Sequence, residues 1–268
     1  SLMSTIGQST AGPVDRTRKS AERETSPDGE DPCDNKPPSE LGIAAQAQVS
    51  PDTASLPLLP KPSDSAEWND WHWQMRNRVR KAAHLKNAFP GVDDAGVAEA
   101  VAKFPMAITP YYASLIRTFD NSDPIFRMSM PQIEELIEPA CLKDDPLEED
   151  KDMPVPGLVH RYPDRALLIA TTMCSMYCRH CTRKRVAGHR EGCISAGRMR
   201  QVTRYLSEHP EIRDVIVSGG DPLTMETAAL EQILAAVRSV QTVEIMRIGT
   251  RVPVVMPMRV TDELAGML

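Results

Sequence analysis

The chain has 268 residues, a formal net charge of -6 and six cysteines. This length allows one or two domains with a sizeable hydrophobic core. The acidic balance disfavours a dedicated nucleic-acid-binding protein, because such proteins are usually basic. The cysteines are too few for a disulfide scaffold. Three of them lie close together, which indicates a metal or redox site in a reducing compartment.

No stretch of 18 or more consecutive apolar residues occurs in the sequence, so no membrane span is predicted. The N-terminus lacks the apolar region of a secretory signal peptide. We therefore expect a cytoplasmic protein that has neither a membrane nor a nucleic acid as its partner.

The N-terminal segment, 1–63, has a composition unlike that of a folded domain. It is rich in Pro, Ser, Thr and charged side chains, with hardly any aromatic or large apolar ones. Such a segment cannot bury enough apolar surface to offset the entropy lost on ordering, so a disordered leader is predicted. Cys33 lies in this leader and has no predicted role.

The next region, 64–157, is predicted to be a small helical unit followed by an acidic connector. Apolar residues recur at helical spacing in four segments, 65–85, 91–104, 109–119 and 130–139. The first segment carries all three tryptophans, which favours a helix packed on a core by its aromatic face. Thr109 is a suitable N-cap, with Pro110 at the first helical position. The connector, 143–157, carries a charge run that is typical of a solvated loop.

Strands and helices alternate in residues 158–268. Short apolar runs typical of buried strands occur at 166–172, 213–220 and 242–250. Helical patterns follow them at 195–210, 224–240 and 260–268. Their candidate N-caps are Ser195, Thr224 and Thr261. Alternation at this spacing predicts βα units and a parallel sheet, and hence an α/β fold.

The chain ends inside the last predicted helix, without a glycine stop. Three βα units are too few to close a barrel, and an open parallel sheet exposes an apolar edge. We therefore expect the sequence to be a truncated piece of a longer protein.

Three cysteines with the spacing CxxxCxxC lie in the stretch TTMCSMYCRHCTRKR, residues 171–185. They are Cys174, Cys178 and Cys181. A four-iron cluster offers one ligand site per iron, so three thiolates leave the fourth iron open to another ligand. The spacing favours an iron–sulfur cluster with one open iron.

Two alternatives stay open on spacing alone. A structural zinc ion needs a closed set of four ligands. The nearby candidates for the fourth ligand are His180, His189 and Cys193. In the other alternative the three thiols bind no metal.

The cysteines follow the first predicted strand, and in barrel-like α/β folds the loops after the strands carry the functional site. Three cysteines with this spacing at this place resemble the motif of the radical S-adenosylmethionine (SAM) enzymes. The resemblance implies a [4Fe-4S] cluster whose open iron binds SAM. One electron then cleaves SAM to methionine and a 5′-deoxyadenosyl radical. It also implies a partial TIM-type (β/α)6 barrel, of which only about the first three βα units are present.

The stretch SGGDPL, residues 218–223, ends the second predicted strand. By itself it is equally typical of an ordinary strand-to-helix turn. After a cysteine loop, it resembles the loop that binds the SAM amino group in radical SAM enzymes. The resemblance implies that role for Gly219, Gly220 and Asp221.

Five ordered blocks narrow the resemblance: WNDWHWQMRNRV, ITPYYASLI, DPLEEDKDMPVPGLVHRYPDRALL, CSMYCRHCTRKR and VSGGDPL. Together they resemble the lysine 2,3-aminomutase family, from about residue 64 to the end. The resemblance implies an enzyme that moves the α-amino group of L-lysine to C3 and gives β-lysine. It adds pyridoxal 5′-phosphate (PLP) to the cluster and SAM. It also implies an electron donor such as flavodoxin or ferredoxin, and a full-length parent that is a homo-oligomer.

The resemblance assigns roles to individual residues. The three cysteines match the cluster ligands. Tyr162 and Arg165 match residues that pack against PLP and hydrogen-bond it, and His180 matches a residue close to SAM. Arg183 matches the arginine that pairs with the substrate α-carboxylate, a bidentate task that suits a guanidinium. Without the resemblance, Tyr162 and Arg165 would be surface residues and 183–185 a solvated basic run.

One departure concerns the lysine that holds PLP, which lies in the C-terminal third of family members. The last lysine of this sequence is Lys184, and residues 185–268 contain none. Lys184 lies within the cysteine motif and does not match the PLP lysine. We therefore expect the full-length parent to be an aminomutase and this sequence alone to be inactive.

Several functional alternatives remain. Arginine or glutamate 2,3-aminomutase activity stays open, because residues that recognise the substrate side chain are expected beyond residue 268. An aminomutase that supplies β-lysine for attachment to a translation factor is a rival within the superfamily. A zinc-stabilised binding module that uses RHCTRKR on a nucleic acid is a rival of another class, and the acidic net charge counts against it. A non-catalytic fragment that keeps cluster or SAM binding is the last. Cys141 and Cys193 have no predicted role.

Overall fold

The protein is represented by a computed structural model that describes residues 61–81, 84, 94–137 and 143–268. All of these residues belong to one compact unit, Ser50–Leu268. The predicted leader lies outside the described residues except for 61–63, and so do Cys33 and Cys141. The division of the rest of the chain at residue 157 stays a prediction.

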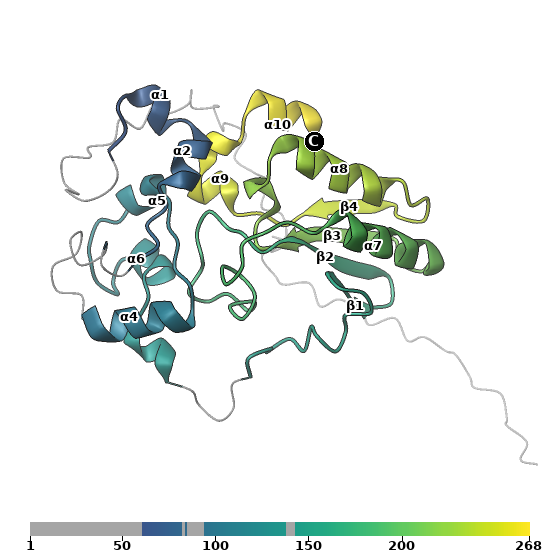
Figure 1. Ribbon diagram of the computed structural model, residues 1–268, viewed down its shortest axis with the longest axis horizontal. Helices are drawn as coiled ribbons and strands as arrows, with labels where there is room; N and C mark the ends of the chain where they lie inside the picture. Colours follow the sequence, from purple (N-terminus) through teal and green to yellow (C-terminus); the bar gives the residue numbers. More distant parts are fainter. Residues whose placement is uncertain (1–60, 82–83, 85–93, 138–142) are drawn as a thin grey trace, which may run out of the picture. The chain divides into compact units, whose positions relative to one another are not determined.

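A four-stranded mixed sheet, in the order β1-β2-β3-β4, organises the second half of the chain. Its strands are β1 Leu158–Tyr162, β2 Arg165–Thr171, β3 Asp214–Gly219 and β4 Ile245–Ile248. The last three are parallel to one another, and β1 runs antiparallel to β2 (Figure 1). The α/β class and the three predicted strands are confirmed. The three predicted strands form a parallel sheet, as expected, and β1, which was not predicted, adds an antiparallel edge strand.

The strand β1 shows no strand periodicity in the sequence. Only Leu158 and Val159 are buried, whereas Arg161 and Tyr162 are exposed. Two apolar residues are too few to reveal a strand pattern. A two-residue turn, Pro163-Asp164, joins β1 to β2 as a hairpin.

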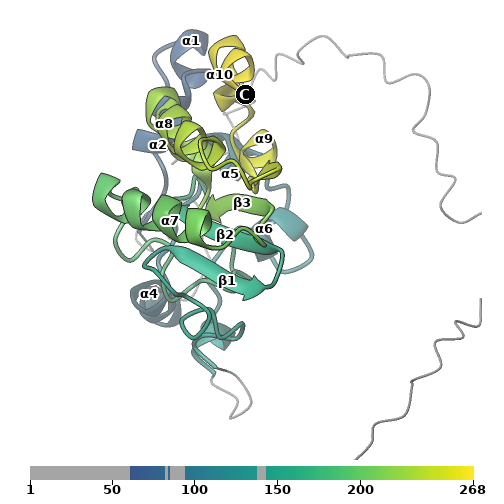
Figure 2. The ribbon, with the colours of Figure 1, turned by 90° about the vertical axis from the view of Figure 1, so that its right-hand side faces the viewer.

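Two long helices, α7 Ala196–Glu208 and α8 Thr227–Arg238, lie along the same side of β2 and β3 (Figure 2). Their buried residues form one core with strand residues, including Val202, Leu206, Leu230, Leu234, Leu168, Ala170, Val215 and Val217. On the opposite face of β2, Leu167 and Ile169 are only partly buried. The predicted buried strand is therefore fully buried on one face and only partly buried on the other.

The helix caps follow the sequence with one exception. Ser195 caps α7, and Thr261 caps α10 Asp262–Met267, as predicted. Thr224 does not cap α8. It lies in the 3-10 helix η3 Pro222–Thr224, where its hydroxyl donates to the Asp221 carbonyl at 2.7 Å. Two short elements precede α10, namely α9 Val252–Val255 and the 3-10 helix η4 Pro257–Arg259.

In the predicted helix over 65–85, residues 65–76 form two short helices, α1 Ser65–Trp68 and α2 Trp71–Arg76, and residues 82–83 and 85 lie outside the described residues. The break falls at Asp70, whose carboxylate accepts hydrogen bonds from two main-chain N–H groups of α2 and so starts a new helix. All three tryptophans are buried, which confirms that their aromatic side chains pack on a core.

The rest of the N-terminal part consists of α4 Asp94–Lys103, α5 Pro110–Ser114, α6 Pro124–Ser129 and the 3-10 helix η2 Ile133–Leu136. Thr109 caps α5 with Pro110 at its start, as predicted. The predicted helix over 130–139 is wrong. The α-helix lies earlier, where Asp123 supplies the cap of α6, and only η2 falls in the described part of 130–139. Within the described ranges, no helix combines the length and apolar character needed to cross a membrane.

Candidate metal centre

The C-terminal ends of β2, β3 and β4 lie at one edge of the sheet, because these strands are parallel. The loop after β2, residues 172–194, carries the three cysteines and is called the cysteine loop. The start of the SGGDPL turn lies against it. Gly220 N donates to the Thr171 carbonyl at 2.6 Å, and Asp221 N donates to the Met173 carbonyl at 2.8 Å. The structure thus brings together the two sequence motifs that carry the predicted site.

Two glycines make this approach possible. Gly219 has a φ of +116°, a conformation that other residues rarely adopt. A Cβ atom at Gly220 would collide with the main chain of Met173. Both glycines therefore serve the contact between the loops, and their role in holding SAM stays a prediction.

Asp221 links the loops after β3 and β4. Its Oδ1 accepts a hydrogen bond from Thr250 Oγ1 at 2.7 Å, and its Oδ2 accepts one from Arg251 N at 2.7 Å. Burial raises the pKa of Asp221, although these hydrogen bonds oppose the shift. Both carboxylate oxygens have partners within the protein, and contact of Asp221 with SAM stays a prediction.

The three thiols are partly buried in the cysteine loop. Burial raises the pKa of Cys174 well above its ordinary value and also raises the pKa of Cys178. Two N–H groups point at sulfur atoms. Arg251 Nη1 donates to Cys178 Sγ at 2.7 Å, and Arg183 N donates to Cys181 Sγ at 3.3 Å. Among the residues that the structure describes, no three His, Cys, Asp or Glu side chains are gathered closely enough to hold a metal ion.

The chemistry of this donor set suits an iron–sulfur cluster. Thiolates hold such clusters, and hydrogen bonds to the sulfur atoms tune them. The predicted candidates for a fourth zinc ligand are all exposed: His180, His189 and Cys193. The main chain of Cys193 pairs with that of Thr171 in an isolated β-bridge. The three thiols are not gathered in the described chain either, so the preference for an open-iron cluster over a closed zinc site rests on the CxxxCxxC spacing and on the exposure of the three candidates for a fourth ligand.

Residues of the N-terminal part contact the cysteine loop through hydrogen bonds. Tyr177 N donates to the Ala107 carbonyl at 3.0 Å, and Arg179 N donates to the Met128 carbonyl at 2.9 Å. The buried Arg179 guanidinium also donates to both oxygens of Glu135, at 2.9 and 2.8 Å. The conformation of the cysteine loop therefore depends on residues that are far away in the sequence.

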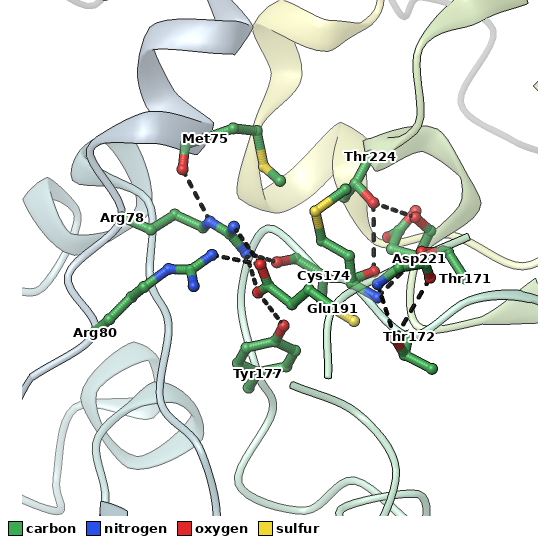
Figure 3. Close-up of polar contacts among 12 residues, drawn as sticks. Met75, Arg78, Arg80, Thr171, Thr172, Cys174, Tyr177, Glu191, Asp221 and Thr224 are labelled. Carbon is green, nitrogen blue, oxygen red and sulfur yellow. Dashed lines mark hydrogen bonds and ion pairs between the residues drawn. The ribbon is translucent and has the colours of Figure 1, made fainter. Parts of the chain in front are cut away.

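Glu191 lies at the centre of a second set of contacts, the Glu191 network, which consists of Arg78, Arg80, Tyr177 and Glu191 (Figure 3). Arg78 donates to both Glu191 oxygens at 3.0 and 3.2 Å, and Arg80 and the Tyr177 hydroxyl donate to them as well. Burial disfavours the charge of Glu191, but the hydrogen bonds from Tyr177, Arg80 and Arg78 outweigh it and lower the pKa of Glu191. Arg78 also donates to the carbonyl of Cys174, so the network fixes the main chain of the first cysteine.

Sequence reasoning missed Arg78, Glu191 and Arg251. Arg78 and Glu191 are 113 positions apart, and no local pattern pairs them. The location of Arg251 could have been predicted from the sequence, because it directly follows the third predicted strand, at the edge of the sheet where the other loops of the site lie.

Arg183 lies beside the cysteines, and its guanidinium is engaged by a carboxylate. Its Nη2 donates to Glu149 Oε1 at 2.6 Å, and Glu149 is buried. Arg185 pairs with Asp145 at 2.9 Å. The interpretation of the acidic connector as a solvated loop is therefore wrong at these two carboxylates, which pair with two of the three cations of the basic run. Binding of a substrate carboxylate by Arg183 stays a prediction.

The structure does not bring Tyr162 and Arg165 to the cysteine loop. Arg165 begins β2, whereas the cysteine loop follows its end, and a seven-residue strand is about 20 Å long. Tyr162 is 57% exposed, and Arg165 pairs with Asp164 at 2.9 Å. His180 is exposed within the cysteine loop. Contacts of these residues with PLP or SAM stay predictions.

Comparison with known proteins connects this geometry to a family. A family profile described as "4Fe-4S single cluster domain" matches residues 164–250, which include the three cysteines. The chain is 49% identical over 212 residues to an L-lysine 2,3-aminomutase of Clostridium subterminale, covering 78% of this chain and 51% of that protein. It is 46% identical over 213 residues to the L-lysine 2,3-aminomutase of Fusobacterium nucleatum, covering 79% and 50%.

A relative with a different substrate in its name also matches. The chain is 38% identical over 204 residues to a glutamate 2,3-aminomutase of Clostridioides difficile, covering 75% of this chain and 48% of that protein. The chain spans about half the length of the curated relatives it matches. High identity over this span, together with the iron–sulfur profile across the cysteine loop, places the chain in the L-lysine 2,3-aminomutase family.

Proposed function

We propose that this chain is the cluster-bearing part of a radical SAM aminomutase that converts L-lysine to β-lysine. The observation that carries the proposal is the cysteine loop. It presents three thiols beside the loops after β3 and β4, in a chain that is 49% identical to an L-lysine 2,3-aminomutase over 212 residues. In this proposal the sheet is the first part of a (β/α)6 barrel, with β2, β3 and β4 as its first three barrel strands.

The proposed cofactors are a [4Fe-4S] cluster, SAM and PLP. Cys174, Cys178 and Cys181 would hold the cluster, and the turn at Gly219 to Asp221 and His180 would lie at SAM. When bound, a reduced cluster supplies the electron that cleaves SAM, and PLP supplies the π-system through which the amino nitrogen migrates.

The PLP contacts of Tyr162 and Arg165 rest on the resemblance alone, since neither lies near the cysteine loop. Arg183 would give up Glu149 to pair with the substrate α-carboxylate.

The chain's own residues prepare this site in two ways. Residues of the N-terminal part and the Glu191 network fix the main chain of the cysteine loop at several points, and the three thiols would gather around the cluster from this loop as it binds. Partial burial of the thiols limits the access of water, which protects a reduced cluster and a radical. We also propose a reducing cytoplasmic location, a flavodoxin- or ferredoxin-type electron donor, and a homo-oligomeric parent protein.

The proposal is tested first by metal content. The chain is reconstituted anaerobically with iron and sulfide, and both are counted. About four irons and four sulfides per chain are expected, and replacement of any one of the three cysteines by Ala should abolish this stoichiometry. Cys193→Ala is the matched control, because Cys193 is exposed, and it should retain the cluster. Zinc without sulfide would overturn the proposal in favour of a zinc-stabilised module.

Substrate choice needs a second assay. With SAM, PLP and a low-potential reductant, product formation is followed from L-lysine, L-glutamate and L-arginine in the parent protein. The account predicts β-lysine as the main product, and β-glutamate would instead favour the activity named for the Clostridioides difficile relative. The 268-residue sequence alone is predicted to be inactive, and a β-amino acid product from it would contradict that prediction.

A further inference from the structure

Among the residues that the structure describes, Arg251 is a cation whose guanidinium contacts the sulfur of one of the three cysteines. It follows β4, at the start of α9. Its Nη1 donates to Cys178 Sγ at 2.7 Å, and its Nη2 lies 3.2 Å from Met128 Sδ. Its main-chain N–H donates to the buried Asp221 carboxylate at 2.7 Å. Both ends of Arg251 are therefore fixed, and its guanidinium is held on the Cys178 sulfur.

The charge of Arg251 differs from the charges of the other buried or partly buried cations around the cysteine loop. Those cations are paired with carboxylates: Arg78 with Glu191, Arg179 and Lys184 with Glu135, and Arg183 with Glu149. Within the described part of the chain, the Arg251 guanidinium forms no ion pair with a carboxylate, because Asp221 binds only its main chain. Its positive charge is therefore available to the sulfur atom.

We infer that Arg251 sets the reduction potential of the proposed cluster by stabilising its reduced form through the Cys178 sulfur. The inference rests on the proposed function. One electron passes from an external low-potential donor to the cluster. The donor is oxidised, the cluster is reduced, and the net charge of the cluster becomes more negative by one. Hydrogen bonds to the sulfur atoms and nearby positive charge stabilise the reduced, more negative form and so raise the reduction potential of such clusters. A charge-assisted hydrogen bond at a partly buried sulfur is stronger than one in water.

The test is a spectroelectrochemical titration of the reconstituted cluster without SAM. Wild type is compared with Arg251→Gln, Arg251→Lys and the control Arg213→Gln. The control makes the same change in net charge at an exposed arginine at the other end of β3. Iron and sulfide are counted first in every variant, so that potentials are compared only between chains with a full cluster.

Arg251→Gln is expected to lower the ratio of reduced to oxidised cluster at a fixed potential by about tenfold. For a one-electron couple this is a shift of about 59 mV to lower potential. Arg251→Lys, which keeps the charge, should shift the potential less, and Arg213→Gln should not shift it. Because SAM is absent, an arginine that only contacts a bound anionic ligand would leave the potential unchanged.

The possible failures are distinguishable. A full cluster with an unchanged potential in Arg251→Gln would overturn the inference and leave the proposed function standing. Loss of the cluster in both Arg251 variants would also overturn it, because Arg251 would then be needed for assembly rather than for tuning. A wild-type chain that takes up no iron and sulfide would overturn the proposed function itself, and the inference with it.

Discussion

Replacement of Glu191 by Gln should destabilise the chain, because it leaves a buried guanidinium without its carboxylate. The Arg78 side chain is only 4% exposed and that of Glu191 is 20% exposed. Arg78 donates to both Glu191 oxygens and to the Cys174 carbonyl, so it cannot turn to water without breaking the contact with the cysteine loop. Gln keeps the shape of the side chain, removes the charge and replaces one of the two acceptor oxygens with an NH2 donor.

The size of the effect follows from the burial of the pair. Removal of one partner from a buried ion pair costs about 3–5 kcal/mol. The lower value, about 3 kcal/mol, applies here because Glu191 is partly exposed and the amide oxygen of Gln still accepts a hydrogen bond. For a unit of the size of Ser50–Leu268, this corresponds to a decrease in Tm of about 6–12 °C.

Thermal and urea unfolding of the metal-free chain at pH 7 measure this difference. Glu244→Gln is the matched control, since Glu244 forms an exposed pair with Arg213, and it should cause no resolvable change. Equal Tm values for Glu191→Gln and the control would refute the reasoning that the Glu191 network is a buried, stabilising set of contacts. An unchanged urea m-value is required for the comparison to be valid.

Three further predictions concern the same region. Tyr177→Phe removes one hydrogen bond to the charged Glu191 and should cost about 2 kcal/mol in urea unfolding, less than Glu191→Gln. Gly220→Ala should lower the iron content after reconstitution at least severalfold, because its Cβ would displace the main chain of Met173, while Gly192→Ala, which meets no atom, should not. The stability gap between wild type and Glu191→Gln should depend on pH. Because the pKa of Glu191 is lowered from 4.5 in the folded chain, its contribution is complete above about pH 4.5 and is lost as the pH falls through the lowered value. A gap that widens in acid would contradict this assignment.

The C-terminal part of the fold could be predicted because its segments are long and regular. β2 and β3 are continuous apolar runs, α7 and α8 carry an apolar pattern of helical period, and the alternation of the two implies parallel βα units. The predicted N-caps at Ser195 and Thr261 are present for the same reason, since capping is a local interaction. β1 was missed because only two of its residues are buried.

The surroundings of the cysteine loop could not be predicted, because they depend on contacts between distant segments. Periodicity joined α1 and α2 into one helix, since Asp70 looks like any polar helix residue until its carboxylate caps α2. The charge run before β1 looked solvated, and burial of Glu149 depends on its meeting Arg183 in the folded chain. The position of Arg251 at the site edge was predictable, but its hydrogen bond to Cys178 was not.

The central claim is that the cysteine loop holds a four-iron cluster with one iron open to SAM. The most direct test is the EPR spectrum of the reduced, reconstituted chain, recorded with and without SAM. The account predicts a spectrum typical of a [4Fe-4S] cluster that changes when SAM is added, because SAM binds the iron without a protein thiolate. A cluster spectrum that SAM leaves unchanged would contradict the open-iron assignment.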